Sequence, residues 1–417
     1  MKAYESYKDS GIQWLPIIPS HWDSSKIKSH FRLRSIKVSD QDFPALSVSK
    51  NGVTPQLESA VKTDNGDNRK LVRAGDFVVN SRSDRKGSCG VSSLDGSVSL
   101  INIVLEPIDG YAQYYHHLFR SNDYIEEFYR NGRGIVSDLW TTRWNEMSSI
   151  MIPFPPIEEQ KKIVAFLDKQ ISLIETCKCQ RERELQTLNE LKQAEIASVV
   201  TRGLNPHVPM KDSGQIQFGE IPAHWDSVKM KYCFIQRSEK GFPNEPVLCA
   251  TQSKGVIPQS LYENRVVVVN KGFEGLKLVK VGDFVISLRS FQGGIEYAYY
   301  QGIISAAYTI LTPKDERNSQ YFKYLFKSHP FIQLLQTCVT GIREGQNINY
   351  AVLGNNFIPI PPIEEQNAIV EYIEAKTNSI DKMIDALKAE IDRLTEYKQR
   401  LISDVVTGQL NVQDEIA

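Results

Sequence analysis

The sequence predicts an α+β protein in which two tandem blocks of mixed β-sheet and helix are joined by two long helices. Two observations support this fold class: the chain of 417 residues repeats itself along its whole length, and each copy ends in a long charged segment with helical periodicity. A chain of this length exceeds one ordinary hydrophobic core, so two or more domains are expected. If the helices pair as an antiparallel coiled coil, a pseudo-two-fold axis relates the two halves.

The repeat is clearest in the hexapeptide PPIEEQ, which stands at Pro155–Gln160 and again at Pro361–Gln366. Other segments recur at a similar spacing: 8–11 with 211–214, 18–24 with 221–227, 71–83 with 278–290, and 199–205 with 405–411. A fixed long period is the signature of a duplicated structural unit. We therefore predict a first block at 1–154, a first long helix at 155–205, a second block at 206–360, and a second long helix with a tail at 361–417.

Each block is predicted to contain a buried strand after a Gly-Asp turn. The apolar runs that follow Asp76 and Asp283 have the length and composition of such strands. Segments 114–129 and 321–336 carry aromatic residues at helical spacing and are predicted to be amphipathic, with these residues in the core. His21 and His224 each precede a tryptophan in a repeated motif, which we interpret as a packing anchor.

The PPIEEQ motif is predicted to begin each long helix. Proline is tolerated in the first helical turn, where the amide needs no partner, and acidic side chains suit the positive end of the helix dipole. We interpret Glu158, Glu159, Glu364 and Glu365 as such helix-starting charges rather than as catalytic carboxylates. The helices are predicted at about 157–202 and 363–407.

A heptad pattern predicts the face along which the long helices pair. The apolar positions of this seam in the second helix are Ile380, Ile384, Leu387, Ile391, Leu394, Leu401 and Val405, with Lys398 as an exception. The matching seam of the first helix is half polar: Ile174, Leu185, Leu188 and Val199 alternate with Lys178, Arg181, Lys192 and Glu195. Two such stripes in one chain can bury each other.

No motif for catalysis stands out. The sequence has no phosphate-binding GxxxxGK[ST] loop, no recognisable methyl-transfer motif, and no HExxH or HxxxH pair. Its six cysteines form no CxxC pair, which is typical of reduced thiols in a cytosolic protein. No apolar run is long enough to span a membrane, and the N-terminal residues do not resemble a secretory signal. We expect a cytoplasmic protein without a metal site.

The repeated IPxHW motif, the PPIEEQ motifs and the long helices that follow them resemble the specificity subunit of a type I restriction-modification enzyme. The resemblance covers nearly the full length; the first copy departs locally, with Leu15–Ile18 where the second has Phe218–Ile221. It implies that each block is a target recognition domain reading half of a bipartite double-stranded DNA sequence. It also implies that the helices fix the gap between the halves and dock two methylation subunits.

The same resemblance implies no catalysis and no cofactor in this chain. The methylation subunits would bind S-adenosylmethionine and modify adenine, and motor-nuclease restriction subunits, with ATP and Mg, would complete the assembly. Two alternatives stay open: a divergent DNA methyltransferase or endonuclease, and a coiled-coil adaptor that binds only protein.

The loops that differ between the blocks hold the DNA-binding candidates. Arginine pairs with guanine and Asn or Gln with adenine in the major groove, while Lys and Arg also hold phosphates. The candidates are Arg82, Arg85, Lys86, Arg133 and Arg143 in the first block, and Arg289, Gln292, Arg343, Gln346, Asn347 and Asn349 in the second. The alternative for each is an exposed surface or turn residue.

Overall fold

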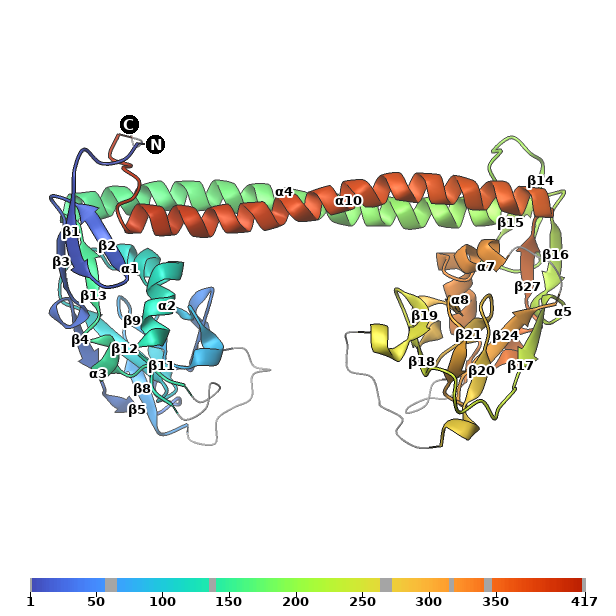
Figure 1. Ribbon diagram of the computed structural model, residues 1–417, viewed down its shortest axis with the longest axis horizontal. Coiled ribbons are helices and arrows are strands. Elements are labelled where there is room, and N and C mark those ends of the chain that lie inside the picture. Colours follow the sequence, from blue (N-terminus) through green and yellow to red (C-terminus); the bar gives the residue numbers. More distant parts are fainter. Residues whose placement is uncertain are drawn as a thin grey trace. The chain divides into compact units, whose positions relative to one another are not determined.

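The computed structural model describes residues 2–56, 66–134, 140–262, 272–314, 319–340 and 347–414 (Figure 1). The chain divides into two compact units: unit 1 is Met1–Glu182 with Ala389–Ala417, and unit 2 is Arg183–Lys388. The long helices α4 (Ile157–Arg202) and α10 (Ile363–Val406) are each divided between the units. Each unit therefore combines one block with the start of one long helix and the end of the other.

Unit 1 is built on a four-stranded antiparallel sheet of order β10-β9-β12-β4. Its strands are β4 (Phe31–Arg34), β9 (Phe77–Asn80), β10 (Cys89–Val91) and β12 (Asn102–Pro107). The remaining strands are β1 (Tyr7–Ile12) with β2 (Leu15–Pro19), β3 (Asp23–Lys26) with β13 (Met151–Phe154), β6 (Leu46–Ser49) with β7 (Gly52–Pro55), and β5 (Lys37–Val38), β8 (Arg69–Val72) and β11 (Gly96–Val98). The helices of the block are η1 (Ile27–Ser29), η2 (Ser83–Arg85), α1 (Ala112–Leu118), α2 (Asn122–Arg130) and α3 (Trp144–Met147).

Unit 2 repeats this order as β22-β21-β24-β17. Its sheet strands are β17 (Phe234–Arg237), β21 (Phe284–Ile286), β22 (Glu296–Tyr297) and β24 (Thr309–Pro313). The other pairs are β14 (Met210–Asp212) with β15 (Glu220–Pro222), β16 (Asp226–Lys229) with β27 (Phe357–Ile360), β18 (Leu248–Thr251) with β19 (Gly255–Pro258), β20 (Lys277–Val279) with β23 (Gly302–Ile304), and β25 (Val339–Thr340) with β26 (Asn347–Ile348). Its helices are α5 (Met230–Cys233), η4 (Gln259–Leu261), η5 (Phe273–Gly275), α6 (Ser290–Gly293), α7 (Ser319–Leu325), α8 (His329–Thr337) and α9 (Tyr350–Leu353).

The strand after each Gly-Asp turn is buried on both faces, as the sequence predicts. In β9, Phe77 and Val79 belong to the main core of unit 1, while Val78 belongs to a smaller core on the other face. In β21, Phe284 and Val285 divide in the same way between the two cores of unit 2. Because side chains alternate along a strand, one apolar run supplies both cores.

Each predicted aromatic segment forms two short helices, α1 with α2 and α7 with α8 (Figure 1). The break falls at a serine that bonds to the preceding turn: Ser121 Oγ donates to Leu118 O and Ser328 Oγ to Leu325 O, both at 2.7 Å. Ser and its hydroxyl favour such local bonds over a continued helix. The aromatic residues are in the core, as predicted, with Tyr114 fully buried.

The long helices end within one residue of the predicted bounds, and they pair antiparallel inside each unit. In unit 1, Lys398 Nζ lies 2.6 Å from Glu175 Oε1, and Arg181 Nε lies 3.1 Å from Glu390 Oε1. In unit 2, Lys192 bonds to Asp381 at 2.6 Å, and the Tyr372 hydroxyl donates to Glu195 Oε1 at 2.6 Å. Four of the five polar seam positions are thus explained, because Arg181, Lys192, Glu195 and Lys398 have partners on the facing helix.

The apolar seam positions are buried near the blocks and half-buried farther along the helices. The buried ones are Ile174, Val199, Ile380, Ile384, Leu401 and Val405, and the half-buried ones are Leu185, Leu188, Leu387, Ile391 and Leu394. Among the described residues, no helix is both long and apolar enough to cross a membrane.

Candidate nucleic-acid interface

The two repeated motifs of unit 1 contact each other. His21 Nε2 lies 2.8 Å from Glu159 Oε2, so the IPxHW motif binds the second glutamate of PPIEEQ. The Tyr4 hydroxyl donates to Glu159 Oε1 at 2.6 Å, and burial together with this bond raises the pKa of Tyr4 well above its usual range. Trp22 is fully buried beside them. The start of α4 is therefore fixed to the β-rich block.

Unit 2 has the same contact between histidine and glutamate, but a tryptophan takes the place of the tyrosine as the second donor to the glutamate. Glu365 Oε2 accepts from Trp225 Nε1 at 2.9 Å and lies 2.8 Å from His224 Nε2. All four PPIEEQ glutamates lie in the first turn of a long helix, as predicted, but the second glutamate of each motif has a further role. Glu158 is exposed and pairs with Lys161, whereas the second glutamate of each motif holds the histidine of the same unit.

A tyrosine joins each block to the end of the other long helix. The Tyr114 hydroxyl on α1 donates to Val406 O of α10 at 3.0 Å, and the Tyr321 hydroxyl on α7 donates to Val200 O of α4 at 2.8 Å. Carbonyls in the last turn of a helix have no partner within the helix, and these hydroxyls supply one. Each block is thereby tied to two helix ends.

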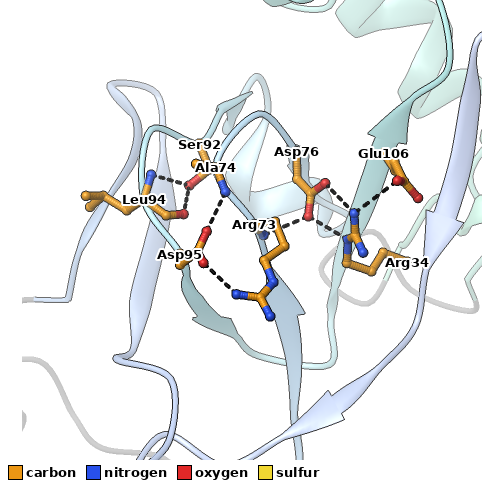
Figure 2. Close-up of polar contacts among 8 residues, drawn as sticks. All are labelled: Arg34, Arg73, Ala74, Asp76, Ser92, Leu94, Asp95 and Glu106. Atoms are coloured by element: carbon orange, nitrogen blue, oxygen red, sulfur yellow. Dashed lines mark hydrogen bonds and ion pairs between the residues drawn. The ribbon is translucent and has the colours of Figure 1, made fainter.

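An arginine–aspartate pair braces the central sheet of each unit. Figure 2 shows Arg34 of β4 between Asp76 and Glu106: Arg34 Nε donates to Asp76 Oδ2 at 2.7 Å, which raises the pKa of Arg34. In unit 2, Arg237 Nε lies 3.0 Å from Asp283 Oδ2. The aspartate also accepts the amide three residues before it, so the Gly-Asp turn and the edge strand share one anchor.

A second ion pair closes the neighbouring turn of unit 1 (Figure 2). Arg73 Nη1 lies 2.5 Å from Asp95 Oδ2, and Asp95 Oδ1 accepts the Ala74 amide at 2.8 Å. The hydrogen bond from the Ala74 amide has the largest effect in lowering the pKa of the Asp95 carboxyl group, and the hydrogen bond from Arg73 lowers it further. These contacts fix the end of the sheet at which β9 begins; the candidate loop leaves from the opposite end of β9.

Thr141 brings two of the unit 1 candidates together. Its backbone bridges to both Arg82 and Arg133, and the Tyr129 hydroxyl donates to Arg82 O at 2.9 Å. Arg85 and Lys86 follow within the same loop, and Lys86 Nζ lies 5.3 Å from the centre of the Tyr129 ring. We call Arg82, Arg85, Lys86 and Arg133 the first basic cluster. Arg143 is exposed at the N-cap of α3.

Every side chain of the first basic cluster is exposed and faces a carboxylate. Asp84 lies 2.9 Å from Arg82 Nε and 3.7 Å from Arg85 Nε. Lys86 Nζ lies 2.9 Å from Glu126 Oε1, and Arg133 Nε lies 3.4 Å from Glu146 Oε1, although the Arg133 side chain is 84% exposed. The ion pairs of Asp84 and Glu126 are exposed on both sides and therefore weak, so an external anion can replace these two carboxylates.

The DNA-binding candidates of unit 2 lie on separate elements and form no single cluster among the described residues. Arg289 and Gln292 are exposed on the single turn of α6, of which Arg289 is the N-cap. Asn349 Oδ1 accepts the Ala351 amide at 2.9 Å and so caps α9, which engages one of its polar atoms. Asn347 belongs to β26, and Arg343 and Gln346 lie outside the described residues.

A family model for the type I restriction modification DNA specificity domain matches residues 41–187 and 223–393. The chain belongs to this family. The two matched regions correspond to the two halves of the sequence repeat, and each includes the start of a long helix. The predicted resemblance is therefore confirmed.

Specificity subunits of type I restriction enzymes are among the relatives of this family member. It is 27% identical over 281 residues to the putative MjaX specificity subunit and 28% identical over 283 residues to the MjaVIII specificity subunit, both from Methanocaldococcus jannaschii. It is 24% identical over 297 residues to the EcoBI specificity subunit from Escherichia coli. Each match covers 64% of this chain and 61%, 63% and 60% of the respective relative, so the chain matches about three-fifths of their length.

Two solved structures share the fold of this specificity-family chain. One, a chain of a type I R-M system studied for its complex assembly and conformational transition, is 17% identical with a TM-score of 0.69, over 94% of this chain and 99% of that chain. The other, the HsdS subunit from Thermoanaerobacter tengcongensis, is 18% identical with a TM-score of 0.51, over 94% and 98%. Both alignments cover 94% of this chain and therefore include most of the two blocks and the two long helices.

The described residues gather no group of three or more His, Cys, Asp or Glu side chains suited to a metal ion. All six cysteines are free, and burial raises the pKa of Cys89 to about 12, which disfavours the reactive thiolate. The contacts that sequence reasoning missed are structural ones in this family member, above all Glu159 with His21. Both motifs recur in both halves of the repeat, but neither motif specifies the other as its partner.

Proposed function

We propose that this chain is the DNA-reading, non-catalytic subunit of a type I restriction-modification complex, in which each unit reads one half of a bipartite double-stranded target. One observation carries the proposal: the two units repeat their framework contacts but differ in the loop after the central strand. Arg34 with Asp76 and Arg237 with Asp283 are equivalent. A protein that reads two different half-sites needs this combination of one scaffold and two surfaces.

The chemistry of the differing loops supports base and phosphate contacts. Unit 1 offers the four cations of the first basic cluster, and unit 2 offers Arg289 and Gln292 on α6. Arginine can bond both acceptors of guanine, and glutamine can bond adenine, at the major-groove edge. The two surfaces therefore favour different base pairs.

The charge arrangement of the first basic cluster gives a specific expectation for affinity. Asp84, Glu126 and Glu146 partly neutralise the cations in the free chain. DNA phosphates would compete with these carboxylates, and binding would release counterions, so affinity would fall steeply with salt. Base contacts rather than net charge would then decide which sequence is bound.

The long helices are proposed to set the gap between the half-sites and to dock two methylation subunits. Helices of 46 and 44 residues each rise about 1.5 Å per residue, so their length is a fixed measure along the chain. The methylation subunits would supply S-adenosylmethionine chemistry on adenine, and restriction subunits would supply ATP and Mg chemistry. This chain would need no cofactor of its own and would act in the cytoplasm.

The decisive test assembles the purified chain with its methylation subunits and maps methylated adenines on a pool of random-sequence duplexes. A bipartite motif that requires this chain supports the proposal. Methylation or cleavage by the chain alone would identify it as an enzyme. A stable complex without sequence preference would identify a protein-only adaptor.

A further inference from the structure

We propose that Lys327 and Glu296 are positioning residues that hold the α6 turn of unit 2 in the conformation that reads DNA. The inference rests on the proposed function, since it assigns Arg289 and Gln292 of α6 to the DNA-facing surface. It is carried by the ion pair between Lys327 and the buried Glu296, which has no equivalent among the described residues of unit 1.

Lys327 joins three separate segments of unit 2 at one ammonium group. Its Nζ donates to Gly293 O, at the end of α6, at 2.8 Å, and to Gln252 O, in the β18–β19 turn, at 3.2 Å. The third partner is Glu296 Oε1 on β22, at 2.5 Å. An ammonium has three donors, and all three are used here.

The Glu296 side chain is only 3% exposed, and its second oxygen, Oε2, is buried with no hydrogen-bond partner among the described residues. A buried carboxylate is costly unless a cation stands beside it. Lys327 is that cation. If its ammonium group moved away from α6, the buried Glu296 carboxylate would lose its charge partner. The pair therefore restrains the turn more strongly than a surface ion pair would.

The backbone after α6 shows a second restraint. Gly294 has φ +82°, and a Cβ there would lie 2.2 Å from Phe326 O, so only glycine fits. The Ile295 amide donates to Phe326 O at 3.3 Å. The backbone after α6 therefore packs against Phe326, the residue before Lys327. The Lys327 side chain bonds to the carbonyl of Gly293, the last residue of α6.

Unit 1 has a different residue at the position equivalent to Glu296. Gly90 lies opposite Val78 on β9, and Glu296 lies opposite Val285 on β21, which is the same register of the two sheets. In place of the carboxylate, unit 1 has His116, whose Nε2 lies 2.8 Å from Arg120 Nη1. The fold therefore does not require a buried carboxylate here, and the loop that it braces is one in which the two units differ.

The test uses the full chain assembled with its methylation subunits and the random duplex pool. Lys327→Met should reduce base preference in one half-site by about tenfold, the size of one good base contact, and leave the other half-site within about twofold. The same half-site should be the one altered by Arg289→Ala. Amide hydrogen exchange of residues 289–296 should become faster.

Two matched variants separate positioning from charge. Lys327→Arg keeps the positive charge and should retain most of the base preference that Lys327→Met loses. Lys323→Met removes a lysine that lies over the Tyr299 and Tyr324 rings, and should leave both half-sites unchanged. Unaltered half-sites in Lys327→Met despite faster exchange, or equal loss in both halves, would overturn the inference. A wild-type chain without a bipartite motif would overturn the proposed function instead, and exchange would still report whether the pair holds α6.

Discussion

Lys192 Nζ lies 2.6 Å from each carboxylate oxygen of Asp381, an ion pair that joins the end of α4 to the start of α10 inside unit 2. The lysine side chain is 22% exposed and the aspartate 49%. The polar residue Lys192, at a heptad position where an apolar side chain is usual, therefore forms a contact between the two helices. Polar residues at such positions fix register at some cost in stability.

Reversing one charge of this pair should destabilise unit 2. Lys192→Asp places two carboxylates together and should lower the free energy of unfolding by about 1 kcal/mol, and Asp381→Lys in the same chain should restore it. Thermal unfolding of the single and double variants measures this. Lys388→Asp is the control, because the partner of Lys388, Asp385, lies on the same helix. Failure of the double variant to recover would contradict the pairing.

The second glutamate of PPIEEQ should matter far more than the first. Glu365→Ala leaves the indole N–H of the fully buried Trp225 without its acceptor, at a cost of about 1–3 kcal/mol. Glu364→Ala removes an exposed side chain and should change stability by less than about 0.5 kcal/mol. Urea unfolding compares the two variants, and equal effects would show that the motif acts only through its charge.

Glu296 should make stability depend on pH. Burial raises its pKa from 4.5 to about 7, against the opposing effect of Lys327. The folded state then holds the proton more tightly than the unfolded state, so stability should fall as pH rises from 4.5 to about 7. Glu296→Gln should lack this component. Urea unfolding of both proteins across that range tests the sign; a wild type that gains stability over the variant as pH rises would mean that the ion pair outweighs burial.

Removing Asp84 should strengthen DNA binding. The carboxylate faces both Arg82 and Arg85, so Asp84→Asn frees two cations and should raise affinity about two- to fivefold at moderate salt. Asp95→Asn removes a comparable exposed carboxylate that pairs with Arg73, and should leave affinity unchanged. Fluorescence anisotropy with a duplex of the mapped target measures both. An equal rise in the two variants would indicate a general charge effect.

Local patterns in the sequence predicted the helices and the central strands because each depends on neighbouring residues. Proline and acidic residues at 155–160 mark a helix start, and an apolar run after Asp76 marks a buried strand. The break at Ser121 was missed, since a helical aromatic stripe continues across it.

Contacts between distant segments could not be predicted in the same way. His21 and Glu159 are 138 residues apart, and nothing in either motif specifies the other as its partner. Glu296 and Lys327 are as ordinary in the sequence as any surface pair, and only burial distinguishes them. The DNA-binding candidates rest on residue type and loop position, to which the structure adds the grouping of Arg82 with Arg133 around Thr141.

We propose that each unit reads its own half-site while the long helices set the gap, and exchanging one block separates these two roles. Residues 1–150 are replaced by the equivalent block of another family member, and the methylated motif is mapped with the same methylation subunits. One half-site should change, while the other half-site and the gap stay as they were, because the proposed base contacts belong to the block and the helix lengths are untouched. A change in both half-sites, or in the gap, would show that the chain does not divide reading and spacing in this way.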